Sequence, residues 1–422
     1  MGKLAIDGGE PTVRLNNTKR WPFYSSNVEE PILSRIREGS LDAAAIDIAI
    51  QAFENDFSNT YCQGLYSIFH CSGTAALLTA YFALGLPRGA EVLVPTNTFR
   101  ATVTPLLTLN LFPVFCDSDP ITRCIDLDDA ESRITPNTKA LVVTHIWGHP
   151  ADMERAVAIC KKNNLFLVED CSHAHGATWN GKRVGTFGDI AVFSLGTKKM
   201  ISGGKAGILV TKHRTFYDRA LLFSQPKHRA NSDMSSSYLK EYLGTGLGVN
   251  FRGSPISAIL ANEHLVRLPR TIESKNNNLT KLEKAIVSEF SELTPPIRDS
   301  RFNEGTWYMY YCTWDVEELS RDFLYKAMKA EGMAVIKPET FLHNQKVFKD
   351  PSIFTTLDFP SFSDRLGEYP VSDWLLKVLI GFETREMYDL SDEVIDMYAE
   401  ALQKISKNYD RLVDLSRKVG EI

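Results

Sequence analysis

Two adjacent lysines and an upstream carboxylate are the residues of this chain whose types and spacing suggest chemistry. Lys198 and Lys199 follow an apolar run at 190–195 and precede a turn rich in Gly and Ser. Asp170 ends another apolar run, at 165–170. A Lys amine can bond to the aldehyde of pyridoxal 5′-phosphate (PLP), and a carboxylate can keep the pyridinium nitrogen protonated. The alternative is a solvated surface lysine, so the interpretation depends on the rest of the site.

A phosphate-binding helix start is the second requirement of such a site. Ser72, Gly73 and Thr74 open a run with helical spacing of apolar residues. A Ser or Thr side chain caps a helix start, and Gly lets the backbone approach a ligand closely. The free N–H groups of a helix N-terminus suit a phosphate. A simple helix cap remains the alternative.

An aromatic residue that could cover the cofactor ring is the third. A short apolar strand at 92–95 leads into a polar turn that ends in Phe99. An aromatic face can stack on a flat pyridine ring. Spacing alone leaves equally open that Phe99 belongs to the core.

The order of these motifs along the chain resembles that of the DegT/DnrJ/EryC1/StrS aminotransferases. The motifs are Ser-Gly-Thr, Pro-x-x-Thr-Phe, Glu-Asp-x-x-x-Ala-His-Gly-Ala, Phe-Ser-x-x-x-x-Lys and Gly-x-Asn-x-Arg. The resemblance runs from about residue 4 to about residue 268 and is thinner beyond. It implies a fold-type I PLP enzyme that aminates a keto-sugar or keto-cyclitol. Trp21-Pro22, His173 and residues 180–185 place the nearest likeness with scyllo-inosose aminotransferases and aminohydroxybenzoate synthases.

The resemblance also implies roles for individual residues. Lys199, six residues after Phe193, would be the covalent anchor, with Lys198 solvated or near the phosphate. Lys199 and Asp170 would be catalytic. The implied cofactor contacts are Ser72, Gly73, Thr74, Phe99, Asp170, His173, Ser194, Lys199 and Asn250. The implied substrate contacts are Lys205, Arg252 and His343.

Asn250 would act across an interface if the resemblance holds. In the family, the Gly-x-Asn-x-Arg turn reaches the phosphate of the partner subunit, which implies a homodimer with shared sites. The alternative is that Asn250 caps the long helix that begins near Ser254.

Two departures from the family pattern concern the substrate side. Lys205 stands where the family usually has Glu, so the local charge changes from negative to positive. It could bind an anionic substrate group or form a structural ion pair. Residues 369–382 lack the common Leu-Pro-Leu run, which leaves that wall of the site undefined.

The composition excludes several classes of protein. The chain has 422 residues, 44% hydrophobic and 23% charged, and a net charge of −5 from 52 acids and 47 bases. This balance is ordinary for a globular protein and offers no basic stripe for nucleic acid. The apolar runs are short and interrupted, and the first residues lack a signal-peptide core, so neither a membrane span nor secretion is expected. Seven cysteines favour reduced thiols in a cytoplasm.

The patterning predicts an α/β fold with a mostly parallel sheet. Continuously apolar strands are expected at 91–95, 111–116, 140–145, 165–170, 190–195 and 208–211, with helical patterns such as 153–162 between them. The candidate residues lie at strand ends, where open α/β sheets bind ligands. We expect an N-terminal arm at 1–30, a large PLP-binding domain at 31–254, and an interdomain helix with a small α+β domain at 255–422.

Some segments are harder to interpret. Residues 29–57 have a helical pattern, and residues 225–248 are polar and indicate a mobile loop, either a flap or disorder without function. A long helix over 255–290 is expected to break softly near Asn276. The aromatic run at 307–311 favours strand packing over a cofactor contact. Further helices are expected at 321–331 and 392–407.

Other kinds of site are disfavoured. His145 and His149 are four apart, but Gly148 and Pro150 argue against one helix face, and no Cys-x-x-Cys accompanies them or the His173/His175 pair, so no metal is expected. No Gly-x-Gly-x-x-Gly indicates a dinucleotide site. The leading interpretation is a PLP-dependent aminotransferase that takes the amino group from glutamine or glutamate and acts in secondary-metabolite biosynthesis, such as that of antibiotics, or in amino-sugar biosynthesis. The alternatives are a PLP-dependent dehydratase, whose relatives tend to carry His at the Lys199 position, and a non-catalytic regulatory subunit of the same fold.

Overall fold

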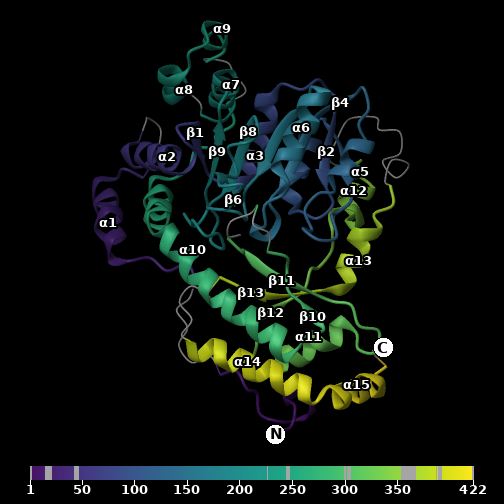
Figure 1. Ribbon diagram of the computed structural model, residues 1–422. Coiled ribbons are helices and arrows are strands. Elements are labelled where there is room, and N and C mark those ends of the chain that lie inside the picture. Colours follow the sequence, from purple (N-terminus) through teal and green to yellow (C-terminus); the bar gives the residue numbers. More distant parts are fainter. Residues whose placement is uncertain are drawn as a thin grey trace.

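The computed structural model is an α/β protein built around a seven-stranded and a four-stranded sheet (Figure 1). It describes residues 2–14, 21–41, 47–225, 227–243, 248–298, 301, 306–352, 367–385, 387 and 392–420. The α/β fold predicted from the sequence is confirmed. None of the helices formed by these residues combines the length and the apolar character that a membrane span requires.

The seven-stranded sheet is the centre of the large domain. Its strands are β1 (Tyr66–His70), β2 (Glu91–Pro95), β3 (Phe112–Cys116), β4 (Thr138–Thr144), β5 (Phe166–Asp170), β8 (Ile190–Ser194) and β9 (Gly207–Thr211), in the order β1-β9-β8-β5-β4-β2-β3. Strands β3, β2, β4, β5 and β8 run parallel, while β9 is antiparallel to β8 and β1. The six strands expected from the sequence are present, and β1 was not expected.

Helices cover both faces of this sheet, because its strands are apolar on both sides. Along β2, Val92 and Val94 join one buried cluster, and Leu93 joins another on the opposite face. The helices of this part are α1 (Glu29–Glu38), α2 (Ile48–Tyr61), α3 (Gly73–Leu84), α4 (Thr104–Thr108), α5 (Leu127–Ser132), α6 (Met153–Asn163), α7 (Arg214–Ser224), α8 (His228–Asp233) and α9 (Ser237–Lys240). Short 3₁₀ turns η3 (Arg100–Thr102) and η4 (Ile146–Gly148) and the small ribbon β6 (Thr178–Trp179)–β7 (Lys182–Arg183) complete it.

The single helical segment predicted over 29–57 is wrong, because two helices occupy it. Helix α1 ends at Gly39, which adopts a left-handed φ of 67° and donates to the carbonyls of Arg35 and Ile36. Helix α2 begins after Asp47, whose carboxylate accepts from the N–H groups of Ala49 and Ile50. Gly after a helix and Asp before one are the ordinary stop and start signals.

The polar segment predicted as a mobile loop contains helices α8 and α9. The side chain of Arg229 forms a buried bidentate pair with Glu54 of α2, with both N–O distances at 2.7 Å. A planar guanidinium and a carboxylate matched in this way fix their elements geometrically. The charged residue that made this segment look mobile therefore anchors it.

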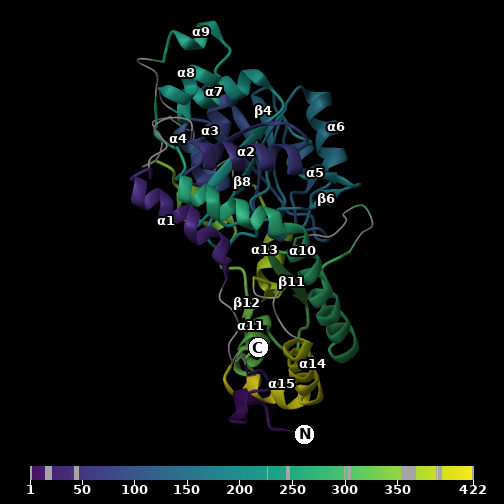
Figure 2. The same ribbon diagram turned by 90° about the vertical axis from the view of Figure 1, so that its left-hand side faces the viewer.

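The long helix α10 (Pro255–Glu289) connects the large domain to the small one (Figure 2). It runs without the break expected near Asn276, and it also accommodates Pro269. Asn276 is buried, as is Asn278, whose amide donates to the Met387 carbonyl. The expected break is absent because these polar side chains are buried in the tertiary structure rather than solvated.

The small domain packs helices on a four-stranded sheet of order β10-β11-β13-β12. Its elements are β10 (Leu293–Thr294), β11 (Met309–Trp314), α11 (Arg321–Ala330), β12 (Val335–Ile336), η5 (Leu342–Asn344), α12 (Lys346–Lys349), α13 (Pro370–Val378), β13 (Leu379–Glu383), α14 (Asp392–Lys407) and α15 (Tyr409–Lys418). The expected helices over 321–331 and 392–407 are confirmed.

Helix α13 also attaches the small domain to the large one. The Asp117 carboxylate, after β3, accepts hydrogen bonds from the N–H groups of Val371 and Ser372 at 3.0 and 2.9 Å. The Ser372 hydroxyl lies 2.7 Å from that of Thr96, at the end of β2. A carboxylate is favourable at a helix N-terminus, where N–H groups lack helical acceptors.

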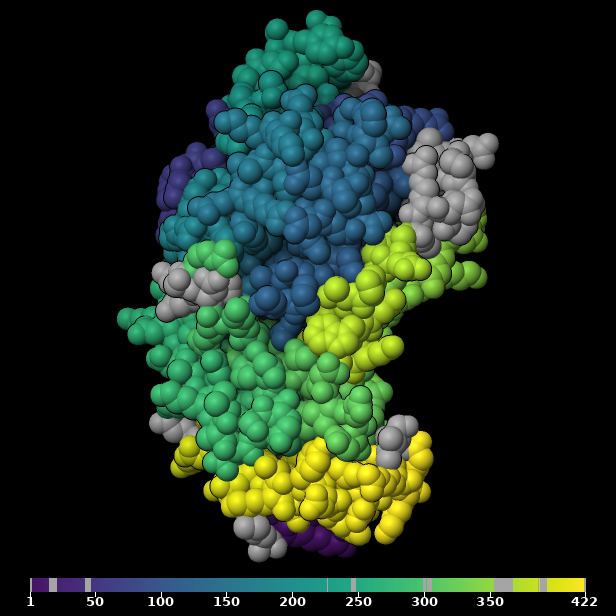
Figure 3. All heavy atoms as spheres, turned by 45° about the vertical axis from the view of Figure 1, so that its right-hand side comes forward, coloured from purple at the N-terminus to yellow at the C-terminus, as the bar shows by residue number. Residues whose placement is uncertain are grey.

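The first residues of the chain pack on the small domain. The N–H of Ala5, in η1 (Ala5–Asp7), donates to Glu331 at 2.8 Å, and Asp7 pairs with Arg411 at 2.9 Å. Figure 3 shows this N-terminal segment, in purple, against the yellow C-terminal helices. A turn at η2 (Ser26–Val28) precedes α1. The division into residues 1–30, 31–254 and 255–422 stays a prediction.

Candidate active site

A cavity of about 680 Å³ opens where the carboxyl ends of the parallel strands face the small domain. Nine of the predicted site residues line it: Ser72, Gly73, Thr74, Phe99, Asp170, His173, Ser194, Lys199 and Lys205. Residues distant in sequence meet here because the ends of β5 and β8 and the start of α3 share one edge of the sheet.

Asp170 ends β5 at this edge and is only 3% exposed. Its Oδ2 atom accepts a 2.7 Å hydrogen bond from the Thr102 hydroxyl, and its Oδ1 atom accepts one of 3.0 Å from the Ser172 N–H. Thr98 lies 2.7 Å from Thr102 and 2.9 Å from Thr144, and extends the network. The carboxylate is thus held in one orientation at the cavity wall. Thr102 was not predicted from the sequence.

Ser72, Gly73 and Ser194 form a tight cradle around the start of α3. The Ser72 hydroxyl caps the helix by accepting from the Ala75 N–H at 3.0 Å. A Cβ atom on Gly73 would lie 2.7 Å from the Cβ of Ser194, and one on Gly207 would lie 2.5 Å from the Ser72 backbone. Both positions therefore require glycine. The free N–H groups of the first helical turn remain available to an anion.

Lys199 extends into the same cavity from the turn after β8 and is partly buried, whereas Lys198 is exposed. Burial lowers the pKa of Lys199 to about 8; the Asp170 charge opposes this shift, and Lys198 adds to it. Its Nζ atom lies 4.2 Å from the centre of the Tyr308 ring. An amine with such a pKa is partly unprotonated at physiological pH, which suits it to nucleophilic attack and proton transfer.

His173 faces the cavity as a neutral imidazole. Its Nδ1 atom accepts from the N–H of Trp147 at 3.3 Å, which places the ring proton on Nε2. Burial and then the charge of Lys199 hold the pKa of His173 well below its usual value. The ring stacks on Tyr308 with centres 4.2 Å apart and planes 8° apart.

Aromatic residues form the wall opposite the cofactor cradle. Trp147, Tyr308, Met309 and Tyr311 line the cavity, and the Trp147 ring lies 4.2 Å from that of Tyr311. Trp147 adopts a left-handed backbone with φ of 54°, which is costly for a bulky residue and is common at functional sites. The prediction that the 307–311 run serves packing holds for Trp307 and Tyr310, which are buried in one core cluster, and for Tyr311, which is buried in another. Tyr311 also lines the cavity, as do Tyr308 and Met309.

Phe99 lies at the cavity mouth with 57% of its surface exposed. This exposure rules out the core position that the sequence left open. The guanidinium of Arg100 lies 5.4 Å from the centre of its ring. The ring face is therefore accessible at the place where a ligand would enter.

Three predicted site residues do not line this cavity in the single chain: Asn250, Arg252 and His343. The Asn250 side chain accepts from Arg252 Nε at 2.9 Å. It is not the cap of α10, because Ser254 fills that position. His343 is 6% exposed and pairs with Asp373 at 2.9 Å beside a separate depression. The functional roles of all three stay predictions.

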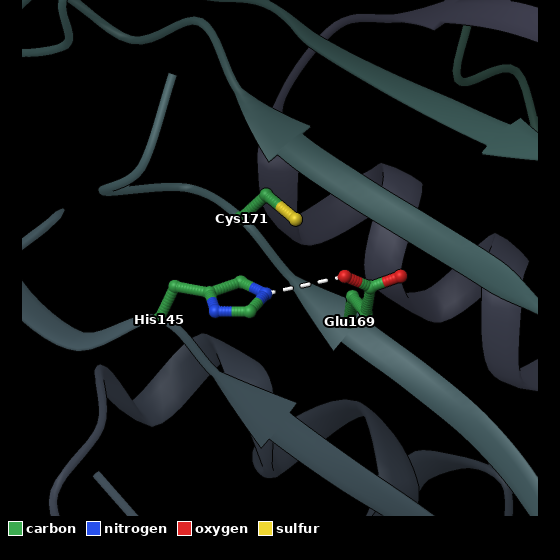
Figure 4. A group of neighbouring side chains, drawn as sticks. All are labelled: His145, Glu169 and Cys171. Atoms are coloured by element: carbon green, nitrogen blue, oxygen red, sulfur yellow. Dashed lines mark hydrogen bonds and ion pairs between the residues drawn. The ribbon is translucent and has the colours of Figure 1, made fainter. Parts of the chain in front are cut away.

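A second cluster, His145, Glu169 and Cys171, has the composition of a metal site but not its chemistry (Figure 4). Glu169 accepts from the N–H groups of Gly185, Phe187 and Gly188 and pairs with His145 at 3.2 Å. His145 Nδ1 accepts from the Ala151 N–H, so Nε2 carries the proton and has no lone pair for a metal. Burial raises the pKa of the Cys171 thiol, which stays protonated. The hydrogen bonds of Glu169 instead fix the end of β5 to the neighbouring segments.

The residues around the main cavity fit PLP. The cradle offers helix N–H groups and hydroxyls to a phosphate at a place where a Cβ atom would block it, while Asp170 and Lys199 supply the carboxylate and the amine. The seven cysteines are all free, so no disulfide joins the two domains.

Comparison with known proteins agrees with this geometry. Residues 47–366 match the DegT/DnrJ/EryC1/StrS aminotransferase family, which is more than half of the chain. A GDP-perosamine synthase of Escherichia coli O157:H7 is 31% identical over 77% of this chain and 81% of its own length. An L-glutamine:2-deoxy-scyllo-inosose aminotransferase of Streptomyces kanamyceticus is 28% identical over 96% of both chains.

Solved structures share the fold. An aminotransferase from Psychrobacter cryohalolentis superposes with a TM-score of 0.81 at 22% identity, covering 93% of this chain and 99% of that one. A 3-amino-5-hydroxybenzoic acid synthase gives a TM-score of 0.80 at 23% identity, covering 94% and 100%. With the sequence match and the cavity described above, these findings show that the chain belongs to the DegT/DnrJ/EryC1/StrS family and is a PLP-dependent aminotransferase.

Proposed function

We propose that this enzyme transfers an amino group from glutamine or glutamate to the ketone of a sugar or cyclitol. The observation that carries the proposal is the meeting of Lys199, Asp170 and the Ser72–Ser194 cradle in one cavity with an aromatic wall. The relatives named for perosamine and scyllo-inosose amination support this class of acceptor. The intact Lys199 disfavours the dehydratase alternative.

Bound PLP would supply an aldehyde that exchanges between amines and a ring that withdraws electrons from the substrate carbon. Ser72, Gly73, Thr74 and Ser194 would hold its phosphate, and Asp170 its ring nitrogen. Thr102 and Ser172 keep the Asp170 carboxylate oriented. A buried carboxylate fixed in this way can keep the ring nitrogen protonated through a charge-assisted hydrogen bond.

Lys199 would have two tasks, covalent attachment and proton transfer. With a pKa of about 8, its amine is partly unprotonated at neutral pH and can accept a proton at Nζ. In one half-reaction the amino acid would become a keto acid and leave its amino group on the enzyme. In the second half-reaction the ketone would receive that group, with Lys199 returning the proton.

His173 and Phe99 would complete the cofactor site. The neutral His173 imidazole carries its proton on Nε2, so it can donate a hydrogen bond into the cavity. Phe99 offers a ring face for stacking. The cavity is enclosed further by Trp147, Tyr308 and Tyr311, which limit the water near the reacting atoms.

Lys205 is a candidate for binding an anionic group of the acceptor. It is exposed at the cavity and has no ion-pair partner among the residues that the structure describes. The alternative role in a structural ion pair therefore has no support in a single chain. Arg252 and His343 are proposed as further acceptor contacts on the resemblance alone.

The active enzyme is proposed to be a homodimer with shared sites. Asn250 lies away from its own cavity, which suits a residue that serves the phosphate of a second copy. A cytoplasmic location is proposed from the seven free cysteines, and a biosynthetic role, as in antibiotic formation, from the named relatives.

A donor-by-acceptor assay tests the proposal. The PLP-loaded enzyme is mixed with L-glutamine or L-glutamate, and loss of the visible cofactor band reports the first half-reaction. 2-Deoxy-scyllo-inosose and a nucleotide-linked 4-keto sugar are then added as acceptors, with an aliphatic 2-keto acid as a control. Return of the band with a cyclic ketone and formation of its amine support the proposal. Return with the keto acid only would overturn it.

A further inference from the structure

Tyr308 is a cavity residue whose contacts none of the roles above explains. It is partly buried just before β11, and it reaches from the small domain into a cavity built mainly by the large one. One ring face stacks on His173 at 4.2 Å. The same ring lies 4.2 Å from the Nζ atom of Lys199. Tyr308 is thus the meeting point of a proposed cofactor contact and the proposed covalent anchor.

Hydrogen bonds from Thr384 and Lys275 hold the backbone at Trp307 and Tyr308. The Thr384 hydroxyl, after β13, lies 3.0 Å from the Tyr308 carbonyl. The buried Lys275 amine of α10 lies 3.3 Å from that hydroxyl and 3.4 Å from the Trp307 carbonyl. Lys275 also lies 3.1 Å from the sulfur of Met200, the residue after Lys199. The Lys275 amine and the Thr384 hydroxyl therefore link the backbone at Tyr308 to Met200, the neighbour of Lys199.

An aromatic ring attracts a cation to its face and attracts an uncharged amine much less. The contact between Lys199 and Tyr308 therefore favours the protonated amine, against the effect of burial. Lys199 must be free of the cofactor during part of each half-reaction, and its amine carries a proton from the moment it accepts one until it returns it. We propose that Tyr308 is a positioning residue whose ring face receives the Lys199 amine whenever that amine is not bonded to the cofactor.

This inference rests on the proposed role of Lys199 and goes beyond it, because it assigns a place to the released amine. The charged and titratable groups that also act on Lys199 are Asp170 and Lys198, while His173 and His175 lie close and feel its charge. Glu383 and Arg385 act on Tyr308 itself. A test has to leave all of these in place and change only the ring.

Fluorination of the ring meets this condition. Tyr308→Phe is compared with 3,4,5-trifluorophenylalanine introduced at the same position, which keeps the shape and withdraws electrons from the ring face. Cofactor-free enzyme is labelled with trace acetic anhydride between pH 6 and pH 10, and mass spectrometry of the Lys199 peptide gives the titration of that amine. Lys205, which is exposed, serves as an internal control in every sample.

The expected result is specific to position 308. Lys199 should titrate alike in the wild type and in Tyr308→Phe, and with the trifluorinated ring its pKa should be lower by about half to one pH unit. Trifluorophenylalanine at Tyr311, which lies on β11 against Trp147, should leave the Lys199 titration unchanged.

An unchanged Lys199 titration with the fluorinated ring at 308, or an equal change from position 311, would overturn the inference. Borohydride reduction of the PLP-loaded enzyme, followed by peptide mapping, tests the anchor separately. A label elsewhere would refute the proposed function, and with it any role for Tyr308 in holding the anchor.

Discussion

The hydroxyl of Thr102 donates a 2.7 Å hydrogen bond to Oδ2 of Asp170, and both side chains are buried. Thr102 ends the turn that follows Phe99, so one short segment offers an aromatic face at the cavity mouth and orients the carboxylate at its wall. Charge-assisted hydrogen bonds of this kind keep the Asp170 carboxylate in one position.

Replacing Asp170 with an amide of the same shape tests whether the negative charge of this side chain is needed for the reaction. Asp170→Asn should bind PLP but lower the rate of the half-reaction with L-glutamine by about 10²–10³-fold, because a neutral amide cannot keep the ring nitrogen protonated. Thr102→Val keeps the charge and removes one donor, so a loss of about tenfold is expected. Stopped-flow measurement of the visible band gives both rates. A near-normal rate in Asp170→Asn would contradict the assigned role.

The two adjacent lysines should behave differently. Borohydride reduction should fix the pyridoxyl group on Lys199, which is partly buried with a pKa of about 8, and not on exposed Lys198. Lys199→Ala should abolish turnover and the visible band of the covalent cofactor. Lys198→Ala is the matched control and should keep that band. Label on the Lys198 side chain would refute the assignment.

Lys275 should make stability depend on pH. Burial, and then the nearby Arg385, lower its pKa from 10.5 to about 7. Between these values the unfolded chain binds a proton that the folded chain does not, so this group lowers stability progressively as pH falls from 10.5 to 7, with no further change below. Lys275→Met should therefore be more stable than wild type at pH 6, by about 2–4 kcal/mol, and similar at pH 10.5.

Urea unfolding at several pH values measures this effect. Lys284→Met is the control, since Lys284 is exposed on the same helix. Parallel pH profiles for wild type and Lys275→Met would show that Lys275 is charged in the folded protein, against the prediction.

Shared active sites predict complementation between inactive subunits. Lys199→Ala and Asn250→Ala should each be impaired, but a mixed dimer would gather both changes in one site and leave the other intact. Refolding the two together should restore up to about a quarter of wild-type activity, because half of the dimers are mixed and each has one intact site. Mixed dimers that form without regaining activity would show that Asn250 acts in its own subunit.

The sequence located the cavity well because the chemistry of this fold gathers at strand ends. Asp170, Ser194 and Lys199 each follow or end an expected apolar strand, so their meeting could be expected before the structure was known. Ser72 was located by its helix-start pattern instead, because the strand before it was not predicted. Gly73 carried its own signal, since a close approach to Ser194 demands glycine.

The opposite wall could not be predicted in the same way. Tyr308 and Tyr311 reach the cavity because the small domain docks there, a tertiary arrangement without a local pattern. Met309 and Tyr311 alternate with the core residue Tyr310 along β11, which in retrospect is a period-two signal. Trp147 depends on a left-handed backbone that no composition rule favours for a bulky side chain.

Two predictions failed because charged or polar side chains were taken to be solvated. The segment containing Arg229 looked solvated, but the guanidinium finds Glu54 from α2 inside the protein. Asn278 looked like a helix break, but its amide finds a carbonyl of the small domain. In both cases the partner lies far along the chain, and spacing cannot reveal it.

The two domains are fastened to each other at several places around the cavity. Helix α10 and the Asp117–α13 contact lie on different sides of the junction (Figure 1). Between them, the Arg123 side chain donates to the Tyr311 carbonyl and the Thr313 hydroxyl, and the Thr306 N–H donates to the Gly148 carbonyl. A junction fastened at both sides and in the middle resists opening as a hinge, so the substrate would enter a site whose two walls are already in place. Removing one attachment, for instance through Asp117→Ala, would loosen the alignment of Tyr308 with Lys199.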